Sequence, residues 1–454
     1  MNRDAPELLS PSMRADPPAD HAVAGMLAGA AGPHQLAERI AAVNRELARW
    51  DSNGALARWQ PGPDLDPRAA TALKEYLATC LALPDWADPE RIARAEALFM
   101  DFGLLSCTLL FCASLPECYV LPDLSAVLHA AGQLEAHTDY RVRSTAAMIF
   151  PVMLEGGLAT PAGAGVAQAL KVRLIHATIR HLILRGSPAD SQGAGPVRPL
   201  LAAGGGIHHV LYAHGWDTAR SGLPCNQDEL AYTLLTFHYV FLRSLRKLGL
   251  GLEPGQEEDY LHAWNVMGHM LGIERALMAD TMDQARDLFT QIQARARQVV
   301  RTPDVRPALA AALTRAMADE IPLRLFKPFP TLLTRHLCGR DASADLGLTG
   351  RQPLPSTLLF AGGMLVVRAI DAVVRLLVPG FSISRAVTRA FGYRLVSRFL
   401  MDQTRPLRLP DPLRGQVRQA VDAWRHDPRA PRWLNRLEGR LAGRRAEQRD
   451  AQEA

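Results

Sequence analysis

Three side chains near the middle of the sequence have types and spacings that suit a buried metal cofactor. His176 lies in the run LKVRLIHATIRHLILR, whose aliphatic residues predict a helix with an apolar inner side. A neutral imidazole on a rigid helix is a good axial ligand for haem iron. A histidine on an apolar helix face is also commonly an ordinary core residue, so this run alone leaves both interpretations open.

The other two side chains come from the preceding run, DYRVRSTAAMIF. Arg141 and Thr145 are four residues apart and therefore share one face of a predicted helix, whereas Arg143 points elsewhere. A guanidinium and a hydroxyl projecting from an apolar helix can bind a haem propionate or orient dioxygen. The alternative is a surface arginine and a threonine that is hydrogen-bonded to its own helix.

Consecutive helices must position these residues. The pattern predicts helices near 123–134, 138–154 and 163–185, and the last two are separated by the glycines and prolines of 156–165. Two helices joined in this way form an antiparallel hairpin. Their polar groups can then face a common slot wide enough for a flat macrocycle, which the spacing permits but does not show.

The remainder of the chain also favours helices. Apolar residues make up 48% and aromatic residues 6%, and no stretch alternates as several strands would. We therefore predict an all-α, multi-helix protein. Further helices are expected at 67–82, 89–113, 226–248, about 254–280, 280–299, 304–319, 354–402, 411–425 and 431–448, with an irregular segment at 186–225. Asn226 is a good cap for one of them, with Glu229 at the reciprocal capping-box position.

The predicted organisation has three parts. Residues 1–33, rich in Pro, Ala, Asp and Gly, read as a disordered tail. Residues 34–340 form the helical core, and 350–450 form a helical C-terminal extension that is part of the core or packs on it.

Five stretches, in order, resemble the latex-clearing-protein (rubber oxygenase) family and its wider superfamily, which includes an endoplasmic-reticulum-bound oxygenase of mycophenolic acid biosynthesis. They cover most of residues 119–280 and read VLPDLSAVLHAAGQL, RVRSTAAMIFPVMLEGGL, VRLIHATIRHLIL, GLPCNQDELAYTLLTFHYVFLRSLRKLGL and YLHAWNVMGHMLGIERALM. The resemblance implies a globin-like core with haem b. His176 matches the family's proximal iron ligand, and Arg141 and Thr145 match its distal residues.

One departure from the family concerns the distal side. Latex-clearing proteins carry a lysine that can occupy the distal iron position, and the residue here is Ser144. A hydroxyl is a poor iron ligand beside an amine, so we expect an open or water-bound position. His269 is a remote alternative for that position.

The N-terminal run lacks the charged start and apolar core of a signal peptide, which predicts a cytoplasmic protein. The basic segment 364–401 can lie along an anionic membrane or pack on the domain. A net charge of +5 without a dense basic block argues against nucleic acid.

Other candidate ligands have weaker patterns. His262 and His269 are seven apart, which is not the usual spacing of a two-histidine metal site, and His208, His209 and His214 lie in a glycine-rich loop without supporting cysteines or carboxylates. The six cysteines form no CxxC pair and are interpreted as buried free thiols.

The sequence therefore predicts a haem b oxygenase that uses dioxygen on an apolar, olefinic substrate, either a small molecule or a polymer. Oxidative cleavage of a carbon–carbon double bond is the leading chemistry. A haem-binding sensor or carrier and a haem-free helical binding protein are the alternatives.

Overall fold

The structure is a computed structural model that describes residues 10–30, 32–132, 148–191, 195–201, 206–299, 301–319 and 321–377. Within these residues the secondary structure is helical apart from an isolated β-bridge between Val197 and Trp216, which confirms the predicted all-α class. The helices of the first half are α1 (Pro17–Leu27), α2 (Pro33–Ala48), α3 (Asn53–Ala57), α4 (Pro67–Cys80), α5 (Pro89–Phe102), α6 (Leu104–Leu109), α7 (Leu115–Cys118), α8 (Pro122–Gly132) and α10 (Gly165–Leu184).

The second half contains one long exposed helix and several that belong to the core. Its helices are α11 (Pro188–Ser191), α12 (Ile207–Ala213), α13 (Thr218–Ser221), α14 (Gln227–Phe237), α15 (Tyr239–Lys247), α16 (Pro254–Met270), α17 (Met282–Ala296), α18 (Arg306–Asp319), α19 (Phe329–Cys338), α20 (Arg340–Asp345) and α21 (Leu354–Leu377). Three single-turn elements complete the list: η1 (Pro11–Met13), the π-helix η2 (Leu110–Ser114) and η3 (Arg275–Leu277).

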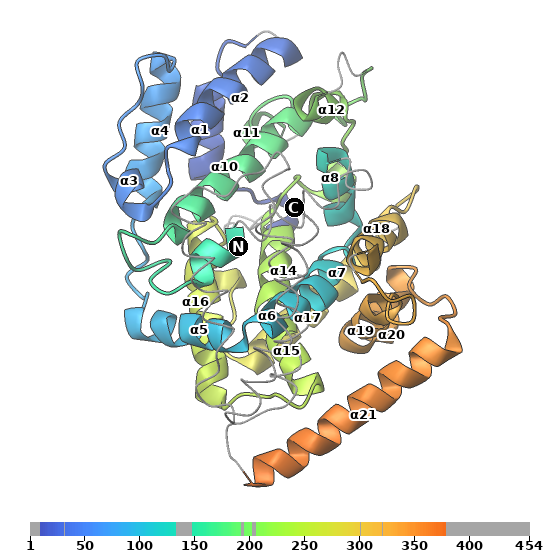
Figure 1. Ribbon diagram of the computed structural model, residues 1–454. Helices are drawn as coiled ribbons and strands as arrows, with labels where there is room; N and C mark the ends of the chain where they lie inside the picture. The colour runs from blue at the N-terminus through green and yellow to red at the C-terminus, as the bar shows by residue number, and fades with distance from the viewer. Residues whose placement is uncertain are drawn as a thin grey trace, which may run out of the picture.

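Helix α10 lies near the centre of the packing. It contacts α1, α12 and α16, and α16 in turn packs on α5 and α14 (Figure 1). The apolar side chains of these helices form a single buried cluster that extends from Ala19 to Leu348. The helix that carries His176 is thus part of the main core.

The N-terminal segment differs from the predicted tail. Residues 17–27 form α1, which packs against α4 and α10 and buries Val23, Met26 and Leu27. Pro17 and Pro18 begin this helix, where a missing backbone N–H has no consequence. The composition was misleading because proline at a helix start and alanine inside a helix are both compatible with order. Residues 1–9 lie outside the described part.

Several predicted boundaries also differ. The helix expected over 89–113 ends at Phe102, where Gly103 has φ +50° and the chain turns by 89° into the next helical segment. The helix expected over 226–248 is interrupted at His238, whose φ of −108° lies outside the helical range. The segment 186–225, expected to be irregular, contains the short helices α11, α12 and α13. Of the predicted C-terminal helices, 378–402, 411–425 and 431–448 lie outside the described residues.

In the described part of the chain, no single helix is both long and apolar enough to cross a membrane. The pair formed by Pro89–Phe102 and Leu105–Cys118 has the required length and composition together, but it is bent by 89°.

Candidate functional site

His176 lies in the second half of α10, on a side of the helix that is partly open. Its side chain is half-buried, and Val172 and Ile179, one turn away on either side, are also half-buried. Ile175 is 49% exposed although the helix passes through the core. Residues 172, 175, 176 and 179 share one helix face. His176 is therefore surrounded by apolar side chains on a face that the described residues do not fully cover.

Two buried arginines anchor α10 on either side of His176. Arg173 donates two hydrogen bonds to Asp16, from Nε at 2.6 Å and from a terminal nitrogen at 2.7 Å. Arg180 is fully buried, pairs with Asp20, and donates to the carbonyl oxygens of residues 224 and 225 at 3.0 and 2.7 Å. Because these contacts lie three residues before and four residues after His176, they fix the rotation of the helix and the direction of the imidazole.

Both ion pairs are removed from solvent, and this burial changes the pKa of their members. Burial lowers the pKa of Arg173, but the hydrogen bonds and charge of Asp16 more than offset this and raise it. Burial raises the pKa of the Asp20 carboxyl, against the opposing effect of Arg180. A buried ion pair of this kind needs both members, since one alone leaves an uncompensated charge in the core.

The turn that precedes α10 is built from glycines in very close contact with the backbone. A Cβ on Gly157 would lie 2.2 Å from the carbonyl oxygen of Pro151, and a Cβ on Gly165 would lie 3.0 Å from the Cα of Val152. Glycine is thus required for the end of the preceding helix, at 148–153, to approach the start of α10. The turn predicted at these glycines is therefore present, whereas residues 138–147 of the helix predicted before it lie outside the described residues.

Asn53, at the start of α3, holds this turn from outside. Its Nδ2 donates to the carbonyl oxygens of Gly157 and Thr160, each at 2.9 Å, and its Oδ1 accepts from the N–H of Ala167 at 3.2 Å. The Glu96 carboxylate accepts from the N–H of Gly156 at 2.8 Å. The hairpin turn is therefore fastened to two other helices, and neither residue was singled out from the sequence.

The remaining predicted site residues are outside the described part of the chain. Arg141, Ser144 and Thr145 precede residue 148, so the structure does not test whether they face His176. The roles assigned to them stay predictions.

The start of α14 packs beside the anchored helix through residues 224 and 225. Asn226 caps α14 as predicted, since its Oδ1 accepts from the N–H of Glu229 at 3.0 Å. The Glu229 carboxylate is buried, and neither oxygen has a hydrogen bond of normal geometry. Burial and the nearby Asp123 raise its pKa to about 8, although the N–H groups of Cys225 and Asn226 lower it in part. We therefore expect Glu229 to be largely protonated at neutral pH.

The predicted alternatives for metal binding have other contacts in the structure. His262 Nε2 accepts from the N–H of Asp88 at 2.9 Å, at the start of α5, and its ring meets Trp86 edge-on at 5.7 Å. His269 contacts the same indole at 6.0 Å. Burial lowers the pKa of both histidines. These contacts give them a packing role between α5 and α16.

The histidines expected in a glycine-rich loop, His208, His209 and His214, lie on or beside α12. The rings of His214 and Trp216 are 6.2 Å apart, and burial lowers the pKa of His208 and of His214. Across the described residues, no three His, Cys, Asp or Glu side chains are grouped as a metal site. A haem iron takes its axial ligand from a single side chain, so that finding concerns only metals held by several side chains. All six cysteines are buried thiols outside any disulfide, as interpreted from the sequence.

The fold and this site define a class: a helical protein with one histidine on a partly open apolar face of an anchored central helix. The sequence model of the family described as "ER-bound oxygenase mpaB/B'/Rubber oxygenase, catalytic domain" matches residues 109–369. This match covers more than half of the chain, and the chain therefore belongs to that oxygenase family.

Two relatives extend the comparison over most of the chain. The rubber oxygenase of Streptomyces sp. (strain K30) is 25% identical over 350 residues, which is 74% of this chain and 75% of that protein. A solved structure of a latex-clearing protein in its closed state has a TM-score of 0.59 at 19% identity and covers 92% of this chain and 91% of its own. The likeness to that structure shows a shared helical fold.

Proposed function

We propose that this protein is a haem b-dependent oxygenase that acts with dioxygen on an apolar, olefinic substrate. The observation that carries the proposal is the position of His176. It lies on a partly open apolar face of a helix held by two buried ion pairs, in a chain of an oxygenase family. Oxidative cleavage of a carbon–carbon double bond is the leading chemistry, because the rubber oxygenase relative covers three quarters of this chain at 25% identity.

The residues that the structure describes suit such a group on the side of His176. A flat macrocycle needs a rigid axial ligand and apolar walls. Val172, Ile175 and Ile179 supply apolar surface beside His176, and Ile175 is 49% exposed in the middle of a core helix. An exposed isoleucine at such a position is readily explained by a cofactor that covers it.

The haem would supply the activation of dioxygen, and the protein would supply ligation, orientation and a dry cavity. His176 would hold the iron. Arg173 and Arg180 would act through α10, as positioning residues, by keeping the imidazole aimed at the cofactor. Arg141 and Thr145 are proposed to bind the propionates or to orient oxygen.

The first test is the axial ligand. His176→Gly should lose the Soret band while its far-ultraviolet circular dichroism stays helical, and added imidazole should restore the band by filling the space left by the side chain. His34→Gly, at a side chain that is 82% exposed on α2, is the control and should keep its haem. Full haem retention in His176→Gly without imidazole would exclude this assignment.

The second test is turnover. Oxygen uptake with an oligo-isoprenoid olefin should be measurable in the wild-type protein and largely lost in Arg141→Ala and Thr145→Ala, with haem retained. Bound haem without oxygen uptake would favour the sensor or carrier, and a colourless protein would favour the haem-free binding protein.

A further inference from the structure

An open hollow in the surface, called the basic cavity below, lies between α18, α19 and the segment that leads to α21, away from the haem site proposed above. Its volume is about 410 Å³. Three cationic side chains, those of Arg315, Lys327 and Arg335, line it together with the hydroxyl-bearing Thr314 and Thr331. Such a set of donors matches a phosphate or another compact anion.

The carboxylates of this region leave part of that positive charge unbalanced. Lys327 pairs with Asp319 at 3.6 Å. Within the described residues, no ion pair is found for Arg315, which is exposed. Arg335 donates to the carbonyl oxygen of Gly350, but its Nε has no hydrogen-bond partner and burial lowers its pKa. An anion in the cavity would supply the missing partner for both arginines.

An exposed apolar surface adjoins the cavity. Leu354, Leu358 and Leu365 of α21 are 75%, 71% and 70% exposed, and their spacing of four and seven residues places them on one face of the helix. In the segment before α19, Leu323 is 60% exposed and Leu325 is 44% exposed. Surface of this extent, with several large aliphatic side chains together, usually marks a contact with a partner or a membrane.

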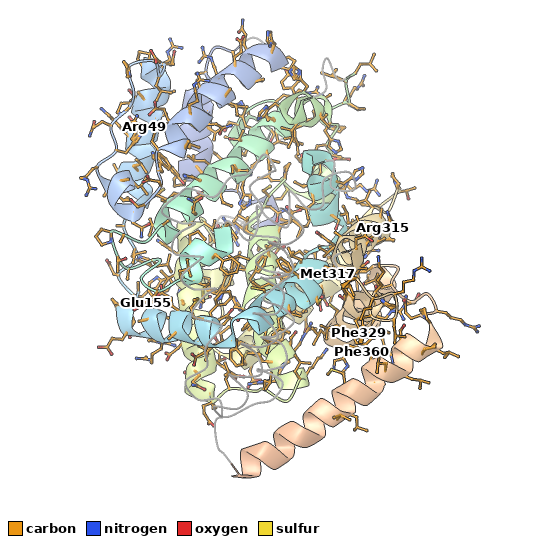
Figure 2. All side chains as sticks on the ribbon, viewed as in Figure 1. Arg49, Glu155, Arg315, Met317, Phe329 and Phe360 are labelled. Carbon is orange, nitrogen blue, oxygen red and sulfur yellow. The ribbon has the colours of Figure 1, made fainter. Side chains whose placement is uncertain are left out.

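Aromatic rings hold α21 against α19. Phe329 of α19 meets Phe326 at 5.0 Å and Phe360 of α21 at 5.5 Å, both edge-on. Figure 2 shows Arg315, Phe329 and Phe360 along the same edge of the molecule. Figure 1 shows α21 running along the outside of the helical body. Gly350 and Gln352 line the basic cavity and lead directly into α21 at Leu354, so the cavity and the first turn of the leucine face lie next to each other.

We propose that this surface docks on a bilayer containing anionic phospholipids, with a lipid phosphate in the basic cavity and the leucine face of α21 in the interfacial region. Charge complementarity selects this occupant. Residues 304–366, which include the Arg306–Asp304 pair, contain seven Lys and Arg residues and five Asp and Glu residues, so the apolar face lies in a segment with a net positive charge. A helix with one apolar face and nearby cations binds the boundary between headgroups and acyl chains.

A fluorescent probe on α21 tests the proposal directly. Because all six native cysteines are buried, a polarity-sensitive thiol dye should label an introduced Leu358→Cys selectively. Its emission should shift to the blue with vesicles of phosphatidylcholine and phosphatidylserine, and not with phosphatidylcholine alone. The same dye on Ile207→Cys of α12, where the native side chain is 46% exposed, should not respond.

Vesicle sedimentation of the full-length protein tests the contributions of the basic cavity and of the leucine face separately. Arg315→Glu should weaken binding to anionic vesicles by at least about tenfold, because each basic residue near such a surface adds measurably to binding. Arg45→Glu, on the exposed side of α2, is the matched control and should bind as wild type does. Leu365→Asp should weaken binding to anionic vesicles, whereas Ile207→Asp should not.

Three results would overturn the proposal. Equal binding to phosphatidylcholine alone would show that the cations are not used, and unchanged binding of Arg315→Glu would remove the cavity from the contact. In the third result, a dye on residue 358 already has the emission maximum of an apolar medium without vesicles and shows no change when vesicles are added. This result would show that another part of the chain or a second copy covers α21. Sedimentation velocity would then distinguish a second copy, which gives a dimer, from another part of the same chain, which gives a monomer.

Discussion

Glu229 offers the sharpest test of how the site region is built, because its carboxylate is buried beside the anchored helix. Burial and Asp123 raise its pKa from an ordinary 4.5 to about 8. Between pH 4.5 and about pH 8, Glu229 is therefore protonated in the folded protein and deprotonated in the unfolded chain. The stability associated with this group is fully present below about pH 4.5 and is lost as the pH rises through about 8.

The magnitude follows from the size of the shift. One pKa unit corresponds to about 1.4 kcal/mol, so the free energy of unfolding should fall by roughly 4 kcal/mol between about pH 5 and about pH 9 through Glu229 alone. The replacement Glu229→Gln keeps the shape of the protonated side chain and can still serve the capping position. It should remove this pH dependence. The free energy of unfolding of the variant should therefore increase relative to that of the wild-type protein as the pH rises.

The assay is urea denaturation followed by circular dichroism at several pH values, for wild type and variant in parallel. Burial also raises the pKa of Glu96, to about 7, and Glu96 titrates in the same window. It is present in both proteins, so its contribution cancels in the difference between them. If the difference in the free energy of unfolding between the two proteins stays constant from about pH 5 to about pH 9, Glu229 is charged throughout this range. Its surroundings would then be more polar than its burial implies.

Three further predictions concern the anchors, the turn and the distal position. Asp20→Ala should lower the free energy of unfolding by about 3–5 kcal/mol, because it leaves the fully buried guanidinium of Arg180 without its carboxylate. The control Asp283→Ala removes an exposed ion pair and should lower it by about 0–1 kcal/mol. Urea denaturation measures both. Gly157→Ala should cost roughly 1–3 kcal/mol or more in the same assay, because the added Cβ would lie 2.2 Å from a carbonyl oxygen, while Gly255→Ala, with open space, should be close to neutral. Ser144→Lys should shift the resting haem spectrum towards low spin, and a spectrum already low spin in the wild-type protein would contradict the open distal position.

The sequence predicted the elements whose signals are local. The helix that carries His176, the glycine turn before it and the Asn226 cap all depend on neighbours within a few residues, and the structure places each of them as predicted. The fold class followed from the same kind of pattern. In contrast, the π-helical segment at 110–114 and the interruption at His238 have no local signal that distinguishes them from a continuous helix.

The unpredicted parts depend on contacts between distant segments. Asp16 and Asp20 are four residues apart in a proline-rich stretch, and their arginine partners lie 157 and 160 residues further along the chain. Nothing in either stretch indicates the other. The same holds for His262: its spacing to His269 argued against a metal site but did not indicate its partner, a backbone N–H 174 positions away.

These long-range contacts connect the first helix to the chemistry. Because Asp20 of α1 and Asp16, the residue directly before α1, supply the carboxylates that hold α10, a chain that lacks residues 10–27 would leave Arg173 and Arg180 buried without these partners on either side of His176. Shortening the N-terminus to residue 28 should therefore lower haem content and stability together, whereas removal of residues 1–9 alone should keep both anchoring pairs. Haem content measured by the Soret band after equal purification of the two truncated proteins distinguishes these outcomes. Equal haem content in both would show that His176 is positioned by the glycine turn and Asn53 alone, and that the arginine pairs serve only the stability of the fold.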